Sequence, residues 1–166
     1  MIEKSVINKV AVAIIDQGGE TIVETRSDDN STFLYDLPSM EAKEGESAHD
    51  IACAICNKTC LYIGRDNLTL IGYVKLENEK TILNITIYAT SVYYTPPVCE
   101  DFNTWFIENL HDDCYGIAPT LAIKSLISST MLQKRRCFRA EITVTGPEEA
   151  IESMHFETFE NLAPTP

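Results

Sequence analysis

The chain has little positive charge, few cysteines and no long apolar run. Its 166 residues carry 13 Lys and Arg against 25 Asp and Glu, for a formal net charge of −12. A surface that binds phosphates along a strand needs clustered Lys and Arg, so this balance argues against general nucleic-acid binding. No apolar run approaches the roughly 18 residues that a membrane-spanning helix needs. We therefore expect no general nucleic-acid binding and no insertion into a membrane.

The six cysteines are too sparse for a scaffold held together by disulfides. The first four residues include an acid and lead into an alternating strand pattern rather than the apolar core of a signal peptide. A cytoplasmic location is the resulting expectation. The phosphate-binding patterns GxxxxGK(S/T) and GxGxxG are also absent. By length the chain is one domain that can bury a substantial core.

Short apolar segments separated by turn residues predict a sheet. The expected strands span residues 9–15, 21–25, 68–76, 81–94 and 137–145. Gly18-Gly19 separates the first two and the polar segment 77–80 the next two, so each pair is predicted to form a hairpin. In the fourth strand alternate residues are apolar, which predicts one face in the core and one in a wetter environment.

Helix patterns occur in two places. Residues 48–60 follow Ser47, a suitable N-cap residue, and present an apolar face. Residues 121–131 are amphipathic and follow Pro119. The acidic segment 148–160, with its spaced apolar side chains, is also expected to form a short helix.

Three cysteines and a histidine recur at helical spacing in the segment 48–60, namely His49, Cys53, Cys56 and Cys60. One interpretation is that the thiols are reduced and pack against the sheet. The other is a metal site made by His49 and Cys53 with ligands from elsewhere. One zinc ion cannot hold all four residues, because they extend over roughly 16 Å of helix.

The segment from Leu37 to Leu61 resembles the Nudix box. That pattern reads Gly, five residues, Glu, seven residues, Arg-Glu-apolar-x-Glu-Glu-x-Gly, usually after a Leu-Pro-Gly lead-in. Leu37-Pro38, Gly45 and Glu46 match it in register. The same register places Met40 at the first Gly, Ala54 at the Arg, Ile55 at the following Glu, Lys58 and Thr59 at the Glu-Glu pair, and Leu61 at the last Gly.

The flanking sequence extends the resemblance over about residues 9–130. Arg26 ends a strand where the family has Gln-Arg, and Tyr35 lies where it often has Trp. Glu100, Trp105-Phe106 and Leu110 are similar to a later family signature. The resemblance implies a Nudix-type α/β/α sandwich, with a mixed sheet between helices. Residues 1–130 would form a Nudix-like (MutT-like) domain, and residues 131–166 an extension of one strand and a short helix, packed on the same domain.

The family's carboxylates hold divalent cations that neutralise phosphate charge and activate the nucleophile. Ile55 and Thr59 supply no charge, and Lys58 repels a cation. We therefore expect a non-catalytic module that needs no cofactor and binds a nucleotide or diphosphate ligand or a protein partner. The alternative is a weak or atypical Nudix-type nucleoside-diphosphate hydrolase that uses Mg²⁺ or Mn²⁺ and replacement acids. Its candidate acids are Glu41, Glu44, Glu46 and Glu100, and Glu46 is the candidate metal ligand.

These acids also have simpler interpretations. Glu41 and Glu44 could be solvated charges of an acidic protein. Glu100 could be an exposed acid at a helix start, where the helix dipole favours negative charge. Glu46, the one family acid retained, would by resemblance support the junction between loop and helix.

Four residues are candidates for ligand binding. Lys58 falls at a metal-binding position, so its ammonium could replace the cation and bind a diphosphate as a point charge. It could instead extend into solvent. Arg26 and Tyr35 would border the cleft, and Trp105 could stack on a base or simply pack. A third class of function is a structural subunit that docks through residues 133–166.

Overall fold

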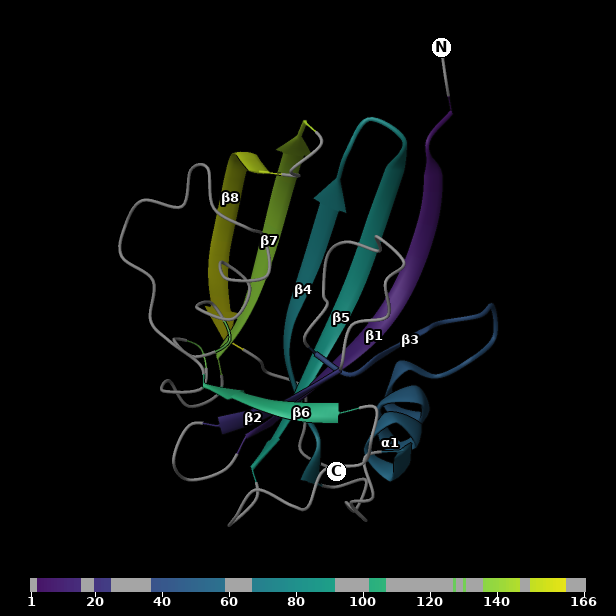
Figure 1. Ribbon diagram of the computed structural model, residues 1–166, viewed down its shortest axis with the longest axis vertical. Coiled ribbons are helices and arrows are strands. Elements are labelled where there is room, and N and C mark those ends of the chain that lie inside the picture. The colour runs from purple at the N-terminus through teal and green to yellow at the C-terminus, as the bar shows by residue number, and fades with distance from the viewer. Residues whose placement is uncertain are drawn as a thin grey trace.

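A computed structural model of the chain describes residues 3–15, 20–24, 37–58, 67–91, 102–106, 127, 130, 136–146 and 150–160. Most of them belong to one mixed sheet with a helix packed against it (Figure 1). The strands are β1 (Ser5–Ile15), β2 (Glu20–Glu24), β3 (Ser39–Glu41), β4 (Thr69–Glu77), β5 (Thr81–Ser91), β6 (Phe102–Phe106), β7 (Arg136–Thr145) and β8 (Ala150–Glu160), and the helix is α1 (Ala48–Lys58). Within these residues no helix is long and apolar enough to cross a membrane.

The strands follow the order β6-β2-β1-β5-β4-β7-β8, and β3 pairs with β1 outside this path. The pairs β1–β5 and β4–β7 are parallel, and the other pairs are antiparallel. Both predicted hairpins, β1–β2 and β4–β5, are confirmed. The side chain of Asn78 closes the second, because its Oδ1 accepts hydrogen bonds from the Lys80 and Thr81 N–H groups at 2.8 and 2.7 Å.

The expectation of a short helix within residues 148–160 is wrong. Residues 150–160 form β8, which pairs along its length with β7. The spacing of Ile151, Met154 and Phe159 is compatible with a helix. The backbone N–H and C=O groups of β7, however, need hydrogen-bond partners, and pairing with them makes the segment a strand. Gly146, at φ +78°, lies in the turn that follows β7.

Residues 102–106 form β6, paired with β2, rather than the beginning of a helix. Their aromatic and β-branched residues suit a strand. Glu100 itself lies outside the described residues.

Two apolar layers enclose the sheet. On one face Val10, Val12 and Ile14 of β1 form a buried cluster with Ile51, Ala52, Ile55 and Cys56 of α1. On the other face, Ala11 and Ala13 join the buried side chains of β4, β5 and β7 and also Ile127. Ile127 and Thr130 are helical and buried, and the rest of the predicted helix 121–131 lies outside the described residues. The predicted mixed sheet with helical residues packed on both faces is therefore confirmed.

Candidate functional site

The residues between β3 and α1 form a tight turn. The Glu46 N–H donates to the Lys43 carbonyl at 3.1 Å, and the Lys43 N–H donates to Glu46 Oε1 at 3.1 Å. Gly45 between them adopts φ +85°, a conformation that glycine reaches without a steric penalty. The Gly-Glu pair shared with the Nudix pattern thus shapes the entry to α1. The Glu46 carboxylate accepts a bond within this turn.

The neighbouring acids face water. Glu41 at the end of β3, Glu44 and Glu46 are all exposed. In the part of the chain that the structure describes, no three His, Cys, Asp or Glu side chains gather into a group that could hold a metal ion. The arrangement of Glu41 and Glu44 therefore agrees with the interpretation as solvated charge.

Helix α1 buries the face that its sequence predicts, consisting of Ile51, Ala52, Ile55 and Cys56. Ile55 is 2% exposed and belongs to the apolar cluster that α1 forms with β1. The position aligned with a family glutamate is thus part of the core. Lys58 aligns with a second glutamate of the family pattern. It is exposed in the last turn of α1, where the helix dipole favours a cation.

The cysteine row divides between core and surface. Cys56 is buried and Cys53 is half-buried, and neither forms a disulfide. Burial, with a smaller contribution from nearby Cys53, raises the pKa of Cys56 from 9.0 to about 12. His49 stacks on Tyr88 of β5, with ring centroids 5.5 Å apart and planes 11° from parallel. The helical face therefore packs against the sheet, as the first interpretation predicts, while Cys60 lies outside the described residues.

A polar surface extends over the sheet on the α1 side, beyond the helix. Figure 1 shows α1 toward one end of the long strands, beside β1 and β3. Past it, exposed polar residues stand in register on five adjacent strands. In strand order they are Asn8, Asn84, Lys75, Glu141 and His155. The Asn84 amide donates to Asn8 Oδ1 at 3.3 Å.

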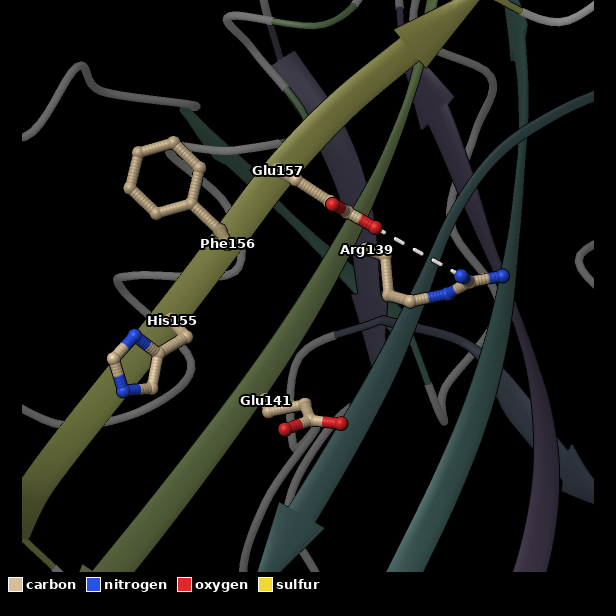
Figure 2. Close-up of a pocket in the computed structure, with 5 residues that line it drawn as sticks. All are labelled: Arg139, Glu141, His155, Phe156 and Glu157. Carbon is tan, nitrogen blue, oxygen red and sulfur yellow. Dashed lines mark ion pairs between the residues drawn. The ribbon is translucent and has the colours of Figure 1, made fainter.

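The adjacent row carries aromatic rings and a cation. The guanidinium of Arg139 lies 5.6 Å from the ring centroids of both Tyr73 and Phe159. It also pairs with Glu157 across the strands, at 3.8 Å (Figure 2). A hollow of about 260 Å³ is lined by Arg139, Glu141, His155, Phe156 and Glu157. Its mixed charge and size suit a polar side chain or a small polar group rather than a polyanion.

Sequence reasoning did not identify this surface. Each strand contributes one or two polar residues, and their alignment depends on strand register, which local periodicity does not reveal. One signal in the sequence could have indicated the exposed face. Lys75, Arg139 and Glu141 are charged residues that alternate with apolar residues along their strands, and those apolar residues are buried.

The remaining candidate residues are not brought together in the described structure. Arg26, Tyr35 and Glu100 lie outside the described residues. Trp105 belongs to β6, opposite Thr21 of β2, and the structure describes its backbone alone.

Comparison with known proteins supports the fold. No protein-family profile matches the chain, and no curated protein matches its sequence. Among solved structures, the mutator MutT protein from Bacillus halodurans matches with a TM-score of 0.64 at 12% identity, over 91% of this chain and 97% of that one. At this identity the match shows a shared fold. The chain therefore has the Nudix-type fold of a MutT protein.

Two further structures match less well. A MutT protein from Methanosarcina mazei Go1 gives a TM-score of 0.49 at 18% identity, over 64% of this chain and 79% of that one. The C-terminal domain of mouse MUTYH, solved in complex with human PCNA, gives a TM-score of 0.48 at 15% identity, over 60% of this chain and 72% of that one. The fold assignment is based on the first match.

Proposed function

We propose that the chain is a cytoplasmic, non-catalytic binding module with a degenerate Nudix box. The supporting observation is Ile55. Its position aligns with a glutamate of the family pattern, and its side chain is buried among the residues that join α1 to β1. A carboxylate placed there would be removed from water, which supports a packing role for this face of the helix.

The proposed ligand is a nucleotide-type molecule that contains a diphosphate. Lys58 is exposed at the end of α1, so its ammonium is free to contact an anion from solvent. An ammonium binds phosphate as a compact charge and needs no metal. Arg26 and Tyr35 are the proposed neighbours at the edge of the cleft.

Isothermal titration with ADP-ribose in EDTA tests this ligand class. Binding should occur without a divalent ion, and Lys58→Glu should weaken it at least tenfold, which is about 1.4 kcal/mol. Lys80→Glu is the matched control, because Lys80 is also exposed but lies in the turn between β4 and β5. Binding that requires magnesium, or that both variants weaken equally, would contradict the role of Lys58.

The second candidate is a protein-binding role through residues 133–166. Phe156 of β8 is 59% exposed, and β8 lies at the end of the strand order. Exposed aromatic residues are typical anchors of protein interfaces. A failure of ADP-ribose and other diphosphates to bind would favour this role.

A further inference from the structure

In the part of the chain that the structure describes, β8 is a long edge strand, and its register with β7 shifts only between Ile151 and Ser153. It lies at the end of the strand order and contains 11 residues, with no Pro, Lys or Arg among them. Residues 155–158 are exposed on both faces of the sheet. An edge of this kind presents unpaired backbone N–H and C=O groups that another strand can satisfy.

The central residues of β8, 154–158, are complementary to themselves when two copies run antiparallel about Phe156. Phe156 then lies opposite the Phe156 of the second copy, and residues equally spaced on either side of it face each other. His155 of each copy lies opposite Glu157 of the other, and Met154 lies opposite Thr158. The basic His155 and the acidic Glu157 thereby meet on both sides of the axis. Toward the ends of the pair the same register places Glu152 opposite Glu160, which opposes pairing there, so the central residues carry the contact.

The charges continue across the joined sheets. Within one chain Lys75, Glu141 and His155 are in register on β4, β7 and β8. Across the axis the same row continues with Glu157 and then Arg139 of the second copy, which already pair at 3.8 Å within each chain. Basic and acidic side chains thus alternate along the row. The Glu157 side chain is 66% exposed in a single copy, so it can receive a second partner.

The opposite face contributes apolar contact. Phe156 is 59% exposed, although its register partner Ala140 is fully buried. Pairing about Phe156 places the two rings together at the axis and removes them from water. We propose that β8 pairs antiparallel with β8 of a second copy of this chain, centred on Phe156, to form a two-fold symmetric dimer.

Engineered cysteines test the register. In the Phe156→Cys variant the two thiols lie on the axis, with Cα atoms roughly 4.5–5.5 Å apart, within the range that a disulfide bridges. In Thr158→Cys the equivalent residues are four positions apart along the strand, or roughly 13 Å. Mild oxidation should therefore link Phe156→Cys into a dimer on a non-reducing gel. The wild type and Thr158→Cys, which is an exposed site on the same strand, are the controls. Equal linkage in all three would overturn the proposal.

Sedimentation velocity tests the interface without cross-linking. The wild type should change from monomer to dimer with a dissociation constant on the order of 10 μM, as a small interface predicts. His155→Glu should weaken the dimer at least tenfold, because Glu then faces Glu157. The double variant His155→Glu with Glu157→His restores opposite partners and should recover most of the affinity. Circular dichroism establishes that each variant is folded. A wild type that stays monomeric at several hundred micromolar, or a double variant no better than His155→Glu, would refute the dimer.

Discussion

Gly72 of β4 lies directly against the ring of Phe138 on β7. The two residues are register partners in the parallel pair, and a Cβ added to Gly72 would stand 2.4 Å from the Cε1 and Cζ atoms of Phe138. Gly72 also follows a register shift in the pairing of β4 with β5. Phe138 is fully buried. The absence of a side chain at residue 72 therefore allows the ring to occupy the core at the junction of β4 and β7.

Gly72→Ala should destabilise the protein by about 1–3 kcal/mol, the usual cost of overpacking a core. Urea denaturation followed by circular dichroism measures the change. Phe138→Leu removes the ring that the new methyl group would meet. The double variant should therefore lose less stability than the sum of the two single losses, and strict additivity would show that the contact is not the cause.

Ile55→Glu should lower the unfolding free energy by more than about 2 kcal/mol, because it places a carboxylate in the buried cluster between α1 and β1. It should bring no hydrolytic activity, since the other aligned positions still lack acids. Lys58→Glu is the control on the same helix. Because Lys58 is exposed, Lys58→Glu should lower the unfolding free energy by no more than about 1 kcal/mol. Equal destabilisation of the two variants in a denaturant titration would contradict the buried position of Ile55.

Stability should fall at alkaline pH through Cys56. Its folded-state pKa of about 12 lies above the ordinary 9.0, so the unfolded chain releases the proton first as pH rises. The contribution is fully present below pH 9 and is lost between about pH 9 and 12, by at most about 1.4 kcal/mol per pH unit. Unfolding curves of the wild type and of Cys56→Ala across this range isolate the effect. Parallel pH dependences in the two proteins would mean that Cys56 is not responsible.

Gly45→Ala should cost about 1–2 kcal/mol, because φ +85° forces a Cβ into the left-handed region. Space is not the reason, since no neighbouring atom lies within 4 Å of the added Cβ. Gly45→Asn should cost less, because asparagine tolerates this conformation better. Thermal unfolding of both variants provides the measurement, and an alanine variant as stable as the wild type would show that this turn relaxes freely.

Local patterns predicted the elements whose own sequence decides their conformation. The helical spacing of Ile51 and Ile55 identified the buried face of α1, and the alternation of Leu83, Ile85 and Ile87 identified the buried face of β5. These periodicities reflect which side of an element meets the core.

Several features that depend on how strands pair were not predicted. The segment 150–160 has apolar spacing compatible with a helix, and the edge of β7 makes it a strand. The alignment of Lys75 with Glu141 arises from the parallel pairing of β4 with β7, which are far apart in the sequence. The contact of Gly72 with Phe138 was not predicted either, because it also depends on the pairing of β4 with β7. A glycine inside a strand does, however, indicate a bulge or a close approach of the backbone.

The most direct test of the proposed function is turnover by the purified chain. Nucleoside triphosphates, ADP-ribose, dinucleoside polyphosphates and capped RNA should each be incubated with magnesium or manganese. Without metal-held charge stabilisation, the account predicts rates several decades below one per second on every substrate. Turnover near one per second on any of them, abolished by Glu41→Gln, Glu44→Gln or Glu46→Gln, would contradict the account and establish a hydrolase that uses replacement acids.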